Sequence, residues 1–398
     1  MIRRPRLHLR DWLMIAVAVA LMAIGSAFVH SASYRSGPMG EGYYTTSPLK
    51  QLQWVVLGGF LFVGVLFVNY RHLLEHAYVL YAIGLALLVY VLFRGVTSEE
   101  ITARRWIDLG PIRLQPSEVM KILVILALAR YLLYNERYRE FGGLLGPFAL
   151  ALMPMLLIAK EPDLGTALVL APVVFAMLYV AAARSRHLKI ILLLAVASGP
   201  IVWMNLHPYQ KERFLDFMAQ EDRQHREQYQ LKHSKIAIGS GGMWGQGLGA
   251  GPENRLNFIP AKTRNNDFIF AVICEEWGFV GANFVLALYF ILLLLCARTA
   301  EETHHPAGRL IVLGVMTMIG TQVVVNAGMA AGQLPVVGIT LPLISYGGSS
   351  LLATLLGLAL VVNVSVYRQV ALSGDDFDPE ASARRGMGPI PEESFLRR

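Results

Sequence analysis

Charged residues are scarce in this sequence, and so are cysteines. Asp, Glu, Lys and Arg make up 16% of the 398 residues, whereas a soluble globular domain carries about 25%. This deficit, together with a hydrophobic content of 55%, excludes an ordinary soluble enzyme and a disordered chain. The two cysteines, Cys274 and Cys296, stand 22 positions apart on one apolar stretch, about 33 Å along a helix. That is too far for a disulfide, so we expect two buried thiols.

The apolar residues form ten segments, each close to the roughly 20 residues that cross a bilayer as a helix. They predict an all-α, polytopic integral membrane protein with about ten transmembrane helices. A cleaved signal peptide is the alternative for the first segment, but its apolar run is long for a signal core and nine more segments follow. The segments run near 12–32, 52–68, 76–93, 117–134, 144–159, 165–182, 188–206, 268–297, 308–330 and 345–367.

The positive charges give these helices an orientation. Four arginines precede the first segment, and further Arg and Lys residues follow the second, fourth, sixth and eighth segments. Because Lys and Arg collect in cytoplasmic loops, we expect both termini in the cytoplasm. Part of the net charge of +7 then reflects membrane orientation rather than nucleic-acid binding. Residues 94–116 carry four arginines on the outer side, and this exception to the rule is itself a hint of function.

A long connection at 207–266, between the seventh and eighth helices, falls on the outer side. A loop of this length in a compact bundle is usually functional or disordered. Its apolar residues predict an ordered loop lying on the membrane. We assign 1–370 to a single membrane domain and the polar, aperiodic residues 371–398 to a disordered cytoplasmic tail. The apolar residues of the loop are Phe214, Leu215, Phe217, Met218, Ile236, Ile238 and Trp244.

Two polar clusters precede predicted spans. In RWIDLGPIRLQPSEVMK, residues 105–121, Ser117 is a candidate helix cap, and Glu118 and Lys121 are three apart and share one helix face. An ionisable pair this close to the hydrocarbon is a functional candidate, and an ordinary interfacial ion pair is the alternative. In KEPDLGT, residues 160–166, the charges belong either to a plain turn or to carboxylates facing a polar cavity.

Three further stretches flank the later spans. The glycine-rich residues 234–251 either approach a phosphate through backbone N–H groups or only pack tightly, and the missing βαβ unit excludes a dinucleotide fold. In NNDFIFAVICEEWGFVG, residues 265–281, Asp267 is either a helix cap or a desolvated general base. At least one of Glu275 and Glu276 must face the bundle interior. Residues 334–352 are rich in Pro and Gly and allow either a ligand or a neighbouring helix to approach closely.

These motifs, in this order on ten spans, resemble the SEDS family of membrane proteins, whose best-known members are RodA and FtsW. The resemblance covers about residues 11–370. It rests on RWIDLG with QPSEVMK, EPDLGTA, SKIAIGSGG, DFIFAVICEEWGFVG and LPLISYGGSSLL. Each motif alone is weak evidence, but five in the same order favour the family strongly.

The resemblance implies a peptidoglycan glycosyltransferase that polymerises lipid II at the outer face of the cytoplasmic membrane. It also implies a class B penicillin-binding protein as partner. Asp267 matches the essential Asp of the family's DFIFA motif, and by analogy with glycoside chemistry would be the base of an inverting transfer. A divalent cation, Mg²⁺ or Mn²⁺, held by Glu118 or Asp163 is plausible, but those carboxylates could instead only orient Lys121. Substrate contacts are expected from Glu118, Lys121, Arg105, Trp106, Asp163, Lys235, Ser345, Gly347, Gly348 and Ser349.

The chain departs from the family pattern just before Asp267. The family typically has Pro-Glu-x-His-Thr ahead of the Asp, whereas here Pro260 is followed by AKTRNN. This segment is longer and lacks both the Glu and the His. Any role of those two residues is therefore in doubt, and Asp267 is left as the acid at the edge of the site.

Other functions fit the same composition. SKIAIGSGG favours a RodA-like role in cell elongation, whereas ITLPLISYGGSSLL favours an FtsW-like role in division. We favour elongation because the central loop is the more distinctive region. A lipid flippase would also need ten spans and buried charges, although a transporter would place its ion pair near the midplane rather than at one face. A non-catalytic scaffold that binds a partner span is a third hypothesis.

Overall fold

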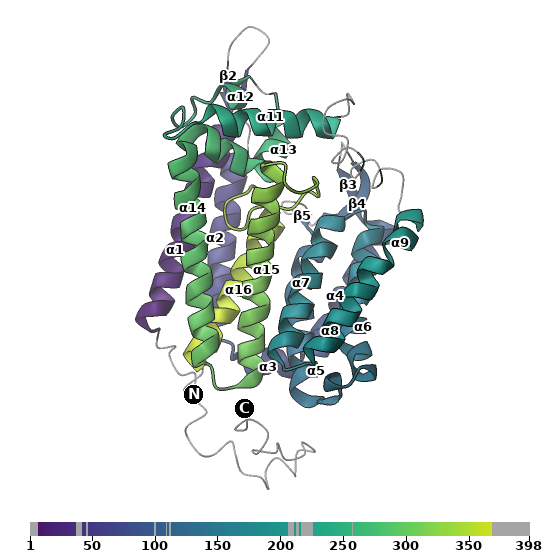
Figure 1. Cartoon of the computed structure of the whole chain (residues 1–398). Coiled ribbons are helices and arrows are strands. Elements are labelled where there is room, and N and C mark those ends of the chain that lie inside the picture. Colours follow the sequence, from purple (N-terminus) through teal and green to yellow (C-terminus); the bar gives the residue numbers. More distant parts are fainter. Residues whose placement is uncertain are drawn as a thin grey trace.

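The computed structural model describes residues 7–36, 42–44, 47–98, 101–108, 110, 113–205, 211, 215, 226–256 and 258–367. These residues form a bundle of long helices with small elements gathered at one end (Figure 1). The start of α1 and the end of α16 lie together at the opposite end. Below, the end that carries α11, α12 and α13 is called the loop end, and the other is called the basic end.

The helices and strands follow the sequence closely. The helices are α1 (Leu9–Ala32), α2 (Ser47–Leu66), α3 (Tyr70–Glu75), α4 (Ala77–Arg94), α5 (Pro116–Tyr134), α6 (Leu145–Lys160), α7 (Leu164–Val180), α8 (Ser185–Ala197), α9 (Gly199–Asn205), α11 (Arg226–Ser240), α12 (Pro252–Arg255), α13 (Ala261–Asn266), α14 (Ile269–Glu302), α15 (Pro306–Ala330) and α16 (Gly348–Tyr367). Two 3₁₀ turns, Arg137–Arg139 and Gly142–Leu144, precede α6. The strands are β1 (Tyr34–Ser36), β2 (Gly42–Tyr44), β3 (Val96–Ser98), β4 (Ile101–Asp108) and β5 (Arg113–Leu114).

The prediction of an all-α membrane protein is confirmed by this architecture. Eight of the ten predicted spans coincide with single helices, and the eighth span coincides with α14, which is interrupted at Gly278. The seventh span matches no single helix: it is divided into α8 and α9 at Ser198. Pro200 follows two residues later; a proline has no N–H for the helical hydrogen-bond ladder and crowds the residue before it, here Gly199. Among the described residues, seven helices are long and apolar enough to cross a membrane, namely α1, α2, α4, α6, α14, α15 and α16.

Burial divides the bundle into central and peripheral helices. Most of α5 and α16 is buried, whereas α2 and α4 carry exposed apolar side chains such as Phe60 and Val79. Exposed apolar surface of this extent is typical of a lipid-facing helix. Gly348 lets α16 lie directly against Trp54 of α2, because a Cβ there would overlap the indole ring. Both cysteines are buried thiols, as predicted.

The segments between helices are more structured than the sequence suggested. The arginine-rich outer segment forms the antiparallel strands β3, β4 and β5, and a second hairpin pairs β1 with β2. Within the long connection, the described residues 226–256 and 258–266 include the helices α11, α12 and α13. Ile238 packs against the core, but Leu215, Ile236 and Trp244 are exposed. The predicted anchors Phe214, Phe217 and Met218 and the predicted tail 371–398 lie outside the described residues.

The glycine-rich turn after α11 hydrogen-bonds to a break in α14. At Gly278 the φ angle is +66° and ψ is −165°, a conformation that is almost restricted to glycine. Before the break the turn donates: the N–H groups of Gln246 and Gly247 bind the carbonyls of Glu275 and Glu276, each at 2.9 Å. After the break α14 donates: the Phe279 N–H binds the Gly242 carbonyl of the turn. The turn is therefore part of the bundle, which supports tight packing as its role.

We predict that Gly278→Ala destabilises the protein by about 1–3 kcal/mol, because alanine is strained at this φ and ψ and its Cβ would overlap the Gly245 N–H. The matched control is Gly59→Ala in α2, where a Cβ would have no neighbour within 4 Å. The apparent melting temperature of the detergent-solubilised protein measures both. Equal melting temperatures for the two variants would contradict the assigned role of Gly278.

Candidate functional site

The first cluster of predicted site residues lies at the start of α5. Lys121 Nζ is 2.8 Å from Glu118 Oε2, and these residues are 1% and 7% exposed. The predicted shared helix face is therefore confirmed as a buried ion pair. Breaking such a pair leaves a buried charge without compensation, which costs about 3–5 kcal/mol.

The Asp163 side chain links the start of α5 to the start of α7 by hydrogen bonds. Its carboxylate accepts hydrogen bonds from the N–H of Thr166 at 3.3 Å and from its hydroxyl at 2.9 Å, so it caps the first turn of α7. The same carboxylate accepts from Gln115 Nε2 at 2.9 Å and from Ser117 Oγ at 3.4 Å. The prediction that Ser117 caps its own helix is wrong, because that helix begins at Pro116 with Gln115 as the N-cap.

Arg105 and Trp106 come from β4, next to this cluster. The Arg105 guanidinium donates to the carbonyl of Glu161 at 2.9 Å and to the carbonyl of Pro162, so it fixes the turn that carries Asp163. Trp106 pairs with Val96 across the sheet and is half-buried. Residues 94–116, whose arginines depart from the positive-inside rule, therefore have a structural role, because Arg105 holds the turn between α6 and α7.

The second cluster surrounds Asp267, which is half-buried and ends α13 directly before α14. Asn326 of α15 donates to the Asp267 carbonyl at 2.9 Å and to the Ile339 carbonyl at 2.7 Å. The Asp267 carboxylate faces Gly338, where a Cβ would lie 3.6 Å from Oδ2. Gly338 has φ +74°, and a Cβ added there would come only into ordinary van der Waals contact with this carboxylate.

The segment between α15 and α16 connects the two clusters. At one side, Ser345 Oγ donates to the Asn266 carbonyl at 2.6 Å. At the other side, where the segment enters α16, Ser349 Oγ of that helix accepts from the Gln115 N–H at 2.9 Å. Gly165 of α7 also lies directly under this segment, because its Cβ would be 2.6 Å from the Val337 carbonyl oxygen. The structure therefore brings the two clusters to the same end of the bundle.

The remaining predicted residues lie around this segment. Gly347 has only ordinary contacts, with Ser350 and Thr340, and Gly348 packs on α2. Lys235 of α11 is exposed and lies beside Gly332, where a Cβ would be 2.8 Å from its Nζ. The segment 332–338 thus has an ammonium group beside one end and the Asp267 carboxylate beside the other.

Neither carboxylate predicted to hold a cation is arranged for one. The Glu118 side chain is paired with Lys121, and Asp163 Oδ2 accepts from three side chains. Among the described residues no group of three or more His, Cys, Asp or Glu side chains could hold a metal ion. These residues do not fit a preassembled Mg²⁺ or Mn²⁺ site, so the divalent cation remains a prediction and no step below depends on it.

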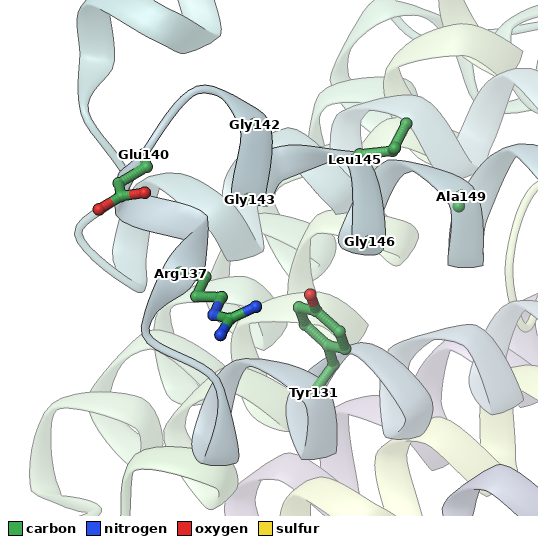
Figure 2. Close-up of a pocket in the computed structure, with 8 residues that line it drawn as sticks. All are labelled: Tyr131, Arg137, Glu140, Gly142, Gly143, Leu145, Gly146 and Ala149. Carbon is green, nitrogen blue, oxygen red and sulfur yellow. The ribbon is translucent and has the colours of Figure 1, made fainter.

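A cavity of about 810 Å³ lies at the other end of the bundle, between the end of α5 and the start of α6. Figure 2 shows the Arg137 guanidinium and the Tyr131 hydroxyl turned toward one space, with the Glu140 carboxylate turned away. None of the predicted site residues lines this cavity. It is therefore separate from the two clusters.

Sequence reasoning missed three residues that hold these clusters in place, namely Gln115, Asn326 and Arg264. Asn326 had a visible signal, because it is an isolated amide in an apolar span and such groups need internal partners. Gln115 opens the QPSEVMK motif, in which Ser117, Glu118 and Lys121 drew the attention. Arg264 stands in the AKTRNN segment, to which sequence reasoning assigned no role, and it is 1% exposed.

Glu161 is a buried acid beside the first cluster, and it was not among the predicted site residues. It lies in the turn between α6 and α7, is 1% exposed, and neither carboxyl oxygen has a hydrogen-bond partner among the described residues. Burial raises the pKa of Glu161 to about 8; repulsion by Asp163 adds to the rise, and attraction to Arg105 opposes it. The folded protein therefore holds this proton more tightly than the unfolded chain does.

We predict that Glu161 makes stability fall as the pH rises. Its contribution is complete below its ordinary pKa of 4.5 and is lost as the pH passes through about 8. Glu161→Gln, which cannot ionise, is expected to lose less melting temperature than the wild type between pH 6 and pH 8.5. The control is Glu140→Gln, which removes an exposed carboxylate. Parallel curves for Glu161→Gln and the wild type would contradict this prediction.

Comparison with known proteins agrees with this arrangement. Residues 11–370 match the model of the cell cycle protein family named for FtsW, RodA and SpoVE. The peptidoglycan glycosyltransferase MrdB of Escherichia coli K12 is 35% identical over 366 residues, which cover 92% of this chain and 95% of MrdB.

Two solved structures are similar along nearly their whole length. One belongs to a peptidoglycan synthase complex studied for the coordination of polymerization and crosslinking; it is 36% identical, with a TM-score of 0.76 over 90% of this chain and 98% of that one. The other is the rod shape determining protein RodA of Thermus thermophilus, which is 33% identical, with a TM-score of 0.65 over 90% of this chain and 97% of that one. The chain therefore belongs to the FtsW/RodA/SpoVE family of cell cycle proteins.

Proposed function

We propose that this protein is a peptidoglycan glycosyltransferase that polymerises lipid II, a disaccharide-peptide on undecaprenyl diphosphate. The observation that carries the proposal is the position of Asp267. This carboxylate is half-buried, its backbone is held by Asn326, and it faces Gly338 of the 331–347 segment. Catalysis by a general base requires such a group within hydrogen-bond reach of the proton that it removes.

In this mechanism Asp267 takes the proton from the acceptor sugar hydroxyl as that hydroxyl attacks the anomeric carbon of the donor. The new glycosidic bond forms while the bond to the diphosphate breaks, so the configuration inverts through an oxocarbenium-like state, by analogy with inverting glycoside chemistry. The diphosphate leaves with its electron pair and needs charge neutralisation more than a proton.

The cations near the site differ in their availability to a diphosphate. Lys121 is buried against Glu118, and Arg105 is bound to backbone carbonyls. Lys235 is exposed and lies beside Gly332. We therefore assign the first contact with the diphosphate to Lys235, and the ordering of the α5–α7 end of the site to Lys121 and Arg105. The sugar rings then lie along 332–338, between Lys235 and Asp267.

The cellular setting follows from the charges and from the relatives. Arg130, Arg137 and Arg184 lie at the end of the bundle opposite Asp267, and the positive-inside rule assigns such an end to the cytoplasm. The active site would then face outward from the cytoplasmic membrane, where lipid-linked donors are presented. We propose a class B penicillin-binding protein as partner, in line with the crosslinking activity of the related synthase complex. Cell elongation, rather than division, remains our preferred role.

We predict that Asp267→Asn lowers the rate of glycan polymerisation by about 10²–10⁴-fold, because a positioned base contributes that much. The assay uses the purified full-length protein and fluorescent lipid II, with glycan products resolved by electrophoresis. Asp108→Asn is the matched control, because Asp108 is an exposed acid at the same end of the bundle. Wild-type polymer from Asp267→Asn would refute the role of Asp267.

A second prediction separates the structural role of the buried ion pair from its role in activity. Lys121→Met leaves the Glu118 carboxylate buried without a cation and should cost about 3–5 kcal/mol of stability. The double variant Glu118→Gln with Lys121→Met removes both charges, so its melting temperature should return toward that of the wild type while its polymerisation stays impaired. Recovery of activity along with stability in the double variant would show that the pair is only structural.

Lipid transport is the second candidate, because α5 carries a buried ion pair and α14 is broken at Gly278. Broken helices and buried charges are features of transporters. The two functions differ in a reconstituted liposome. Transbilayer movement of lipid II without polymer would favour transport, whereas polymer that disappears in Asp267→Asn would favour the transferase.

A further inference from the structure

Arg264 is a buried cation three residues before Asp267. Its Nε and Nη2 atoms donate to the carbonyl of Ala32 at 3.1 and 2.5 Å, and its Nη1 donates to the carbonyl of Asn254 at 2.6 Å. Ala32 is the last residue of α1, where the helix dipole favours a positive charge. The planar guanidinium fork therefore joins α13 to the end of α1 and to α12 at once.

The residues that follow Arg264 are each held by a different part of the fold. Asn265 Nδ2 donates to Ser33 Oγ at 3.1 Å, and the Asn265 carbonyl accepts from the Tyr346 N–H at 2.9 Å. The Asn266 carbonyl accepts from Ser345. The backbone from 264 to 267 is thus fixed to α1, α12, α15 and the 331–347 segment.

From Asn254 the hydrogen-bond network continues to two acids of α14. Asn254 Nδ2 donates to Glu276 Oε1 at 2.6 Å and to Ser31 Oγ at 3.1 Å. The Asn254 N–H donates to Glu275 Oε2 at 3.2 Å. Both glutamates are 1% exposed, so the prediction that at least one faces the interior is confirmed. Arg264 therefore connects the acids of α14, through Asn254, to the segment that ends at Asp267.

We propose that Arg264 is a positioning residue for the transfer reaction: its fork sets the orientation of the α13 segment and thereby the place of the Asp267 carboxylate. The proposal rests on the proposed function, since it assumes that Asp267 is the base. Arg264 does not touch substrate in this role, because its donors bind carbonyls and its side chain is buried.

The geometry of the fork, and not its charge alone, is what the role requires. A lysine places its three donors at one point, whereas arginine spreads its donors over a rigid plane. One ammonium group would not bind the Ala32 and Asn254 carbonyls in the directions that the fork does. A displacement of about 1 Å at a reacting group can cost about 100-fold in rate, so the loss of one anchor should reach the chemistry at Asp267.

The test compares Arg264→Lys, Arg264→Gln, Arg255→Lys and Asp267→Asn in the full-length protein. Arg255 is the matched control, because it lies on the same loop and also donates to a carbonyl, that of Gly249 at 2.6 Å, but is exposed. Polymerisation of fluorescent lipid II gives kcat and KM, and kcat is expressed per lipid II-binding site so that unfolded protein does not count.

For both Arg264 variants we expect kcat to fall about 10- to 100-fold, KM to change by less than about threefold, and Arg255→Lys to behave as the wild type. A normal kcat with a lowered melting temperature would overturn the proposal and leave Arg264 as a stabilising residue. A raised KM with a normal kcat would also overturn it. Arg264→Gln buries no charge, so it decides the matter if Arg264→Lys does not fold.

The Asp267→Asn arm separates this inference from the proposed function. If Asp267→Asn is inactive and the Arg264 variants are normal, only the positioning role fails. If Asp267→Asn polymerises normally, the assignment of the base fails, whatever the Arg264 variants do. A loss of kcat in both would support the two claims together.

Discussion

The loop end of this protein depends on the backbone hydrogen bonds between the glycine-rich turn and α14. Four N–H groups, those of Gln246, Gly247, Phe279 and Val280, find carbonyl partners across the break at Gly278. The break leaves backbone groups of α14 without intrahelical partners, and the turn supplies partners for them. Asn254 also binds the two glutamates of α14 beside the break, so the segment that carries Asp267 has a fixed support.

The site rests on close backbone contacts. Two glycines take part in them. At Gly165 the absence of a side chain lets α7 touch the 331–347 segment, whereas at Gly338 a Cβ would only reach van der Waals contact with the Asp267 carboxylate. The cations of the site are satisfied in two ways: Lys121 by a carboxylate, and Arg105 and Arg264 by backbone carbonyls. Lys235, in contrast, is exposed and lies beside Gly332.

Much of the fold could be predicted from the sequence, because a helix that crosses a bilayer must satisfy its backbone internally and show apolar residues outward. The apolar runs therefore located α1, α4 and α15 within a few residues, and the spacing of Glu118 and Lys121 predicted their contact. Two local predictions failed. Pro200 divides the expected seventh span, and Ser117 turns to Asp163, a residue 46 positions away, instead of capping its own helix.

The sequence by itself determined which helices form, which charges interrupt them, and that Asp267 stands where a polar segment enters a span. These are properties of neighbouring residues, and the 3.6-residue period of the helix relates them directly. Only the tertiary structure decided what Arg264 does, because its partners Ala32 and Asn254 are main-chain carbonyls. Ala32 is 232 positions away, and every residue type carries the same carbonyl group. No side-chain pattern marks such an acceptor, so the contact could be found only once the ends of α1, α12 and α13 had been brought together.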